Sequence, residues 1–104
     1  INGYTFSTNG HFVSLVKYLD VGTLVGETAG ASYLCSSVCE TIKLKNTGLE
    51  LWLSTRAMGT AVEGMEGNYN VEPDIYAPMM IDDYIQENNV ARQTAIELIL
   101  SNAR

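Results

Sequence analysis

Ser7 is the first residue whose type and position could support chemistry. It follows the segment Tyr4–Phe6 and directly precedes a helix that we predict over residues 9–20. A serine in that place is usually an N-cap, whose hydroxyl accepts a hydrogen bond from a backbone N–H. A nucleophile would also suit it, because the helix N-terminus and the backbone N–H of Thr8 could stabilise an oxyanion. The residues alone leave both roles open.

A serine nucleophile needs a general base. His11 is the only histidine of the chain and lies four residues after Ser7. From the same helix it would approach the flank of Ser7 and compete with substrate for that face. We therefore expect His11 to be a surface or partly packed residue rather than the base. The surroundings of Ser7 also lack the glycines of the hydrolase motif G-x-S-x-G.

Cys35 and Cys39 are the two cysteines, and they lie four residues apart. A zinc site needs about four ligands, and a redox motif has two residues between its thiols. The preferred interpretation is therefore a pair of free thiols that pack as small apolar side chains. A local disulfide is the second interpretation and a metal site the third. We expect no metal and no cofactor.

The length, composition and net charge of the chain favour some classes of protein over others. The chain has 104 residues, of which 46% are hydrophobic and 17% charged, which suits one globular domain over residues 1–104. Its formal charge of −6 disfavours nucleic acid as a partner. No apolar run approaches the roughly 20 residues of a membrane span. Because the first residue is Ile1, we expect a processed chain or a fragment.

The periodicity of apolar residues predicts helices over residues 9–20, about 79–87, and from a cap at Asn89 onward. The residues that share the apolar face of the last helix are Ala91, Ala95, Leu98 and Ile99. Residues 23–25 read as a short buried strand. The order of elements is that of an α/β domain whose first strand would lie before Ile1.

A β-hairpin is predicted in the middle of the chain. Residues 41–45 and 49–53 alternate in polarity, and the link between them ends in Gly48. Residues 56–70 then read as a loop, and residues 71–75 contain a proline that suits an edge segment. We expect the apolar face of the hairpin to point into the core, namely Ile42, Leu44, Leu49, Leu51 and Leu53.

Three segments in order resemble a known family. Thr5-Phe6-Ser7, Leu24–Gly30 and Glu66–Ile75 resemble motifs from the C-terminal part of the catalytic domain of tail-specific, or C-terminal-processing, serine peptidases. The similarity is greatest to the tricorn-core-like branch and covers nearly the whole chain. It implies a crotonase-like (ClpP/crotonase type) α/β fold.

The resemblance also implies roles for particular residues. Ser7 matches the nucleophile, the N–H of Thr8 matches an oxyanion-hole donor, and Glu66 matches the glutamate that orients the base. Glu63 and Glu72 are near enough in sequence to be confused with Glu66.

The chain departs from the family pattern at the general base. The serine–lysine branch has its lysine directly after the last glycine of the V-G-E segment, where this chain has Ala31. Lys17 and Lys43 lie elsewhere. In the tricorn-like branch the base is a histidine far upstream of the nucleophile. The segment from Glu66 to Val71 is also one residue longer than the family's. The resemblance thus implies a partial site that is inactive in this chain alone.

The first hypothesis is therefore an enzyme: the nucleophile-bearing segment of a serine endopeptidase that hydrolyses peptide bonds through an acyl-enzyme. Its partners would be a protein or peptide substrate, the remainder of the parent peptidase, and another copy of the chain through an unpaired sheet edge. The alternative is a degenerate, non-catalytic relative that binds peptides or other ligands. A third is an acidic interaction domain with a chance motif match. The resemblance favours an extracytoplasmic location, periplasmic or secreted.

Overall fold

The computed structural model describes residues 1–65 and 70–102, which form a small mixed α/β domain. Within these residues lie three helices and two sheets of two strands each. The elements are α1 (Thr8–Tyr18), β1 (Val25–Gly26), β2 (Leu34–Lys43), β3 (Glu50–Gly59), β4 (Ile75–Tyr76), α2 (Ile81–Ile85) and α3 (Val90–Asn102).

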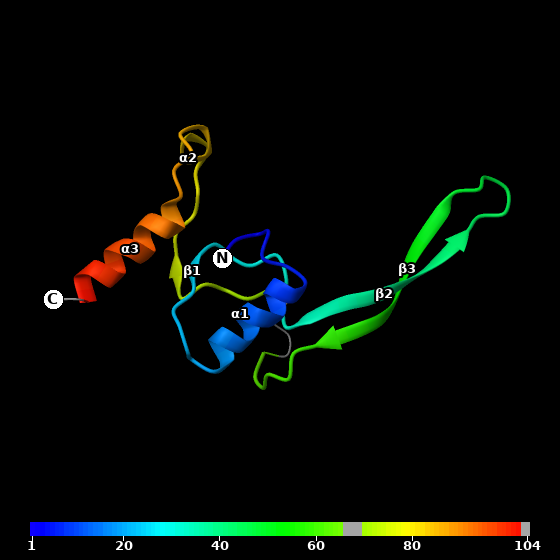
Figure 1. Ribbon diagram of the computed structural model, residues 1–104, viewed down its shortest axis with the longest axis horizontal. Helices are drawn as coiled ribbons and strands as arrows, with labels where there is room; N and C mark the ends of the chain where they lie inside the picture. Colours follow the sequence, from blue (N-terminus) through cyan, green and yellow to red (C-terminus); the bar gives the residue numbers. More distant parts are fainter. Residues whose placement is uncertain (66–69, 103–104) are drawn as a thin grey trace.

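Helix α1 lies at the centre of the molecule (Figure 1). Its buried side consists of Gly10, Val13 and Ser14. The Ser14 hydroxyl donates to the Gly10 carbonyl at 2.7 Å, so its burial leaves no unpaired polar group. A Cβ added at Gly10 would lie 2.8 Å from the Cβ of Ala31. Glycine at this position therefore lets the first turn of α1 approach the segment that precedes β2.

The small parallel sheet holds the first and last thirds of the chain together. Strand β1 pairs with β4, with Val25 opposite Ile75. On the other side of β1, the Ile1 amino group donates to the Val25 carbonyl at 2.7 Å, and the Glu27 N–H donates to the Ile1 carbonyl at 2.9 Å. Gly26 has φ 135°, and a Cβ there would lie 2.0 Å from the Ile1 carbonyl oxygen. Only glycine fits this approach.

The hydrophobic core of the molecule is small. It consists of Val13, Leu24, Ala29 and Val71, with Ile1, Val16 and Met65 packed against it. The Ala29 N–H donates to the Val71 carbonyl at 2.9 Å, so backbone pairing continues beside the apolar contacts. The two regions around residues 24–30 and 71–76, distant in sequence, thus become one packed unit.

The predicted hairpin is confirmed and is longer than expected. Strands β2 and β3 are antiparallel, with Ile42 opposite Leu51 and Leu34 opposite Gly59. The turn ends at Gly48, which has φ 72° and donates its N–H to the Leu44 carbonyl at 2.8 Å. The expectation of a loop from residue 56 was wrong over Arg56–Gly59, because these residues continue the ladder with β2.

The expected burial of the hairpin's apolar face was wrong. The register places Leu51 and Leu53 on one face together with Ile42, as predicted. Leu51 is nevertheless 51% exposed and Leu53 50% exposed. The reason is visible in Figure 1: the hairpin projects away from the rest of the described chain, so no described element covers its distal half.

The last two helices follow β4 as predicted, although α2 is shorter than the predicted span. The Asn89 side chain accepts the Arg92 N–H at 2.9 Å, which confirms Asn89 as the cap of α3. Leu98 is half-buried, whereas Ile99 is 68% exposed, so the predicted apolar face of α3 is only partly covered.

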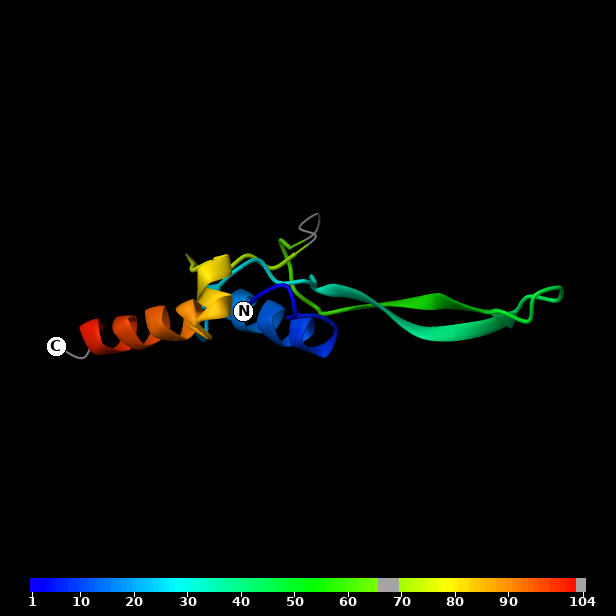
Figure 2. The same cartoon turned by 90° about the horizontal axis from the view of Figure 1, so that it is seen from above.

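The molecule is elongated, with extents of 66 × 38 × 18 Å. Its radius of gyration is 18.0 Å, against about 13 Å for a compact domain of this length. The hairpin and α3 project from opposite ends (Figure 2). Across the described residues, no helix combines the length and apolar character needed to cross a bilayer.

Candidate active site

Ser7 occupies the N-cap position of α1 in a rare backbone conformation. Its φ is 54° and its ψ is −125°. Positive φ is uncommon for a residue with a Cβ and costs of order 1–3 kcal/mol. The Ser7 side chain makes no capping hydrogen bond with the helix. The ordinary explanation for a serine at this place is therefore not realised, and the exposed hydroxyl is not committed to the helix.

A cavity of about 530 Å³ opens beside Ser7. The cavity is lined by residues from the turn before α1, the end of the Leu24–Gly30 segment, the start of β2 and the segment before β4. The lining residues are Phe6, Ser7, Gly30, Ala31, Ser32, Leu34, Cys35, Ser36 and Asn70. All of these side chains are uncharged. Ala31, at the position where the serine–lysine branch has its base, thus lies on the same cavity as Ser7.

Thr8 is the first residue of α1. The N–H groups of the first helical turn have no acceptor within the helix and carry its positive end. The Asn9 N–H donates to the Phe6 carbonyl at 3.1 Å and the His11 N–H to the Ser7 carbonyl at 3.2 Å. The backbone N–H of Thr8 directly follows Ser7 in the chain and lies at the positive end of α1.

Glu66, the predicted orienting acid, lies outside the described residues. The two acids that could be confused with it, Glu63 and Glu72, differ in their surroundings. Glu63 is exposed, whereas Glu72 accepts the Thr28 hydroxyl at 2.7 Å through its carboxylate. Glu72 therefore ties the V-E-P-D segment to the V-G-E-T segment, a structural role for that side chain.

His11 contacts Cys35, a pairing that sequence reasoning missed. Its Nε2 lies 3.0 Å from the Cys35 Sγ, and its Nδ1 lies 2.5 Å from the Thr60 Oγ1. The contact forms because α1 packs against β2 where the hairpin leaves the body. Cys35 is a half-buried free thiol, which agrees with the preferred interpretation of this cysteine.

The pair does not by itself form a metal centre. Among the described residues, no group of three or more His, Cys, Asp or Glu side chains is arranged to hold a metal ion.

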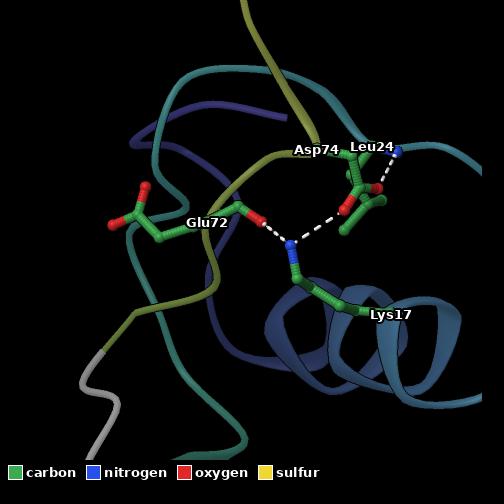
Figure 3. Close-up of polar contacts among 4 residues, drawn as sticks. All are labelled: Lys17, Leu24, Glu72 and Asp74. Atoms are coloured by element: carbon green, nitrogen blue, oxygen red, sulfur yellow. Dashed lines mark hydrogen bonds and ion pairs between the residues drawn. The ribbon is translucent and has the colours of Figure 1, made fainter.

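A polar network fixes α1 against the two paired segments (Figure 3). The Lys17 ammonium donates to the Glu72 carbonyl at 2.7 Å and to the Asp74 carboxylate at 2.9 Å. The other oxygen of Asp74 accepts the Leu24 N–H at 2.8 Å. The Leu24 N–H and then Lys17 lower the pKa of Asp74, because both favour the carboxylate. This network joins the last turn of α1 to the residues that precede β1 and β4.

Comparisons of the chain with protein-family models, curated proteins and solved structures found no match.

Proposed function

We propose that this chain is the nucleophile-bearing segment of a serine-type peptidase with a crotonase-like fold. Ser7 is the nucleophile, the Thr8 N–H is an oxyanion donor, and Glu66 is the acid that orients the base. The general base comes from outside this chain. The resemblance of the three motifs supports these roles, and the structural observations below support the first two.

The observation that carries the proposal is the positive φ of Ser7 together with the lack of a capping hydrogen bond from its side chain. A side chain held at φ 54° without a capping bond costs stability and brings none to the helix. Such strained residues cluster at functional sites. The hydrolase nucleophile also occupies a strained turn that opens a helix. A serine nucleophile therefore accounts for both the backbone strain and the place of Ser7 on the cavity.

The position of Ala31 supports a base from elsewhere. Ala31 lines the cavity with Ser7, so a lysine at this position would lie on the same cavity as the hydroxyl. Alanine cannot take a proton, and His11 is engaged by Cys35 and Thr60. The exposed apolar face of the hairpin also offers surface to which the remainder of the parent could pack.

The reaction that follows is acyl transfer. The external base accepts the Ser7 hydroxyl proton as the oxygen attacks the peptide carbonyl. The Thr8 N–H stabilises the tetrahedral oxyanion, and the base returns the proton to the leaving amine. Water then hydrolyses the acyl-enzyme by the same steps.

The test is cleavage of casein by the parent polypeptide. Ser7→Ala should abolish cleavage, whereas Ser32→Ala should retain it, because Ser32 lines the same cavity but lies outside the proposed triad. Undiminished cleavage by the Ser7→Ala protein would end the proposal. The expected loss is the several orders of magnitude typical of a removed nucleophile.

The alternative is a peptide-binding relative without catalysis. The absence of a titratable side chain at Ala31 favours it, together with the uncharged lining of the cavity. The same variants distinguish the two functions. A binding module would hold a casein peptide equally well with Ser7→Ala and would never cleave it.

A further inference from the structure

Away from Ser7, the described residues include a contact between Cys35, His11 and Thr60. Cys35 lies at the start of β2 and lines the 530 Å³ cavity, while His11 approaches its sulfur from α1. The thiol is free and half-buried. A thiol next to an imidazole and open to a cavity has what a reactive cysteine requires: a proton acceptor and access.

The two contacts are compatible with the tautomer in which His11 is an acceptor. With the ring proton on Nδ1, the Nδ1–H donates to the Thr60 Oγ1 and Nε2 accepts from the Cys35 thiol. This assignment keeps both contacts after proton transfer, because both ring nitrogens are donors in the imidazolium. Thr60 therefore acts as a positioning residue that holds the imidazole against Cys35.

We propose that Cys35 and His11 form a thiol-exchange site for small disulfides that enter this cavity. The Cys35 proton moves to His11 Nε2, and the thiolate attacks one sulfur of the disulfide. A Cys35–S–S–R bond forms as the original S–S bond breaks, and the departing thiolate takes the proton from His11. One disulfide replaces another, so no further oxidant is required. The uncharged lining favours a neutral disulfide. The proposal does not depend on Ser7 chemistry.

Dithiodipyridine is a suitable probe, because it is neutral and releases an absorbing thiopyridone. The chain has two cysteines, so a Cys39→Ser background leaves Cys35 as the reacting thiol. In that background His11→Gln should slow thiopyridone release at least about tenfold. In the matched Cys35→Ser background, His11→Gln should leave any remaining release of thiopyridone unchanged.

Thr60 supplies the independent test. Thr60→Val removes the acceptor for Nδ1–H and should slow the Cys35 reaction, whereas Thr60→Ser retains the hydroxyl and should restore the rate. Circular dichroism checks that each variant is folded. Equal Cys35 rates with and without His11→Gln would overturn the proposal. If His11→Gln disturbs the fold, the Thr60 pair decides: equal rates for Thr60→Val and Thr60→Ser would overturn it.

Discussion

At the scale of single residues, the backbone of Ser7 has a measurable consequence. Glycine tolerates positive φ, so Ser7→Gly should raise the free energy of unfolding by about 1 kcal/mol. Ser7→Ala should change it by less than about 0.5 kcal/mol, because no capping bond is lost. Urea unfolding of the three proteins measures both effects. A loss of about 1–2 kcal/mol for Ser7→Ala would instead identify Ser7 as an ordinary cap.

Asp74 makes stability depend on pH in a definite direction. Its pKa is lowered by the Leu24 N–H and Lys17, so its contribution is present above the unfolded value of about 3.9. That contribution disappears as the pH falls through the lower folded value. Because the Asp74 side chain is 39% exposed, Asp74→Asn should cost only about 1 kcal/mol at neutral pH.

The measurement for Asp74 is urea unfolding of the original and Asp74→Asn proteins from neutral pH down to about pH 2. The difference between them should shrink below about pH 4. Glu63→Gln is the control, because Glu63 is an exposed carboxylate, and its difference should be small throughout. A pH-independent cost for Asp74→Asn would show that its charge does not contribute.

At the scale of elements, the hairpin and the core respond differently to truncation. Leu51→Ala should cost less than about 1 kcal/mol in this chain, because Leu51 is 51% exposed. Val71 is 1% exposed, and Val71→Ala should cost about 2 kcal/mol. Thermal or urea unfolding compares them. If Leu51→Ala costs as much as Val71→Ala, the hairpin face is covered in solution.

The elements themselves could be predicted from the sequence, because local patterns determine them. The helix start near Ser7, the Asn89 cap and the turn at Gly48 depend on residues within a few positions of one another. The burial of Leu51 and Leu53 could not be predicted in this way. Alternation shows which side chains share a face, but whether that face is covered depends on other elements.

The same distinction applies to the candidate site. Ser7 and Thr8 could be proposed from the sequence because they are adjacent and lie where a helix begins, which is where the structure has α1. The contact between His11 and Cys35 depends on how α1 packs against β2. The two residues are 24 positions apart in the sequence, and neither residue type predicts the contact. Ala31 joins the Ser7 cavity because Gly10 admits its close approach, a contact between segments that no local spacing determines.

At the scale of the whole molecule, the elongated shape and the exposed apolar hairpin fit a segment that functions with further polypeptide. Among the described residues that line the cavity there is no histidine, lysine or carboxylate. A serine hydroxyl without a base is a weak nucleophile. The account therefore predicts that Ser7 becomes reactive only when the remainder of the parent is present.

The most direct measurement is labelling by a fluorophosphonate, followed by peptide mapping. The 104-residue chain alone should not be labelled. After the upstream segment of the parent is added as a separate polypeptide, Ser7 should be labelled, and Ser7→Ala should abolish the label. Labelling of the chain alone that His11→Ala stops would contradict the account, because it would make His11 the base that we place outside this chain.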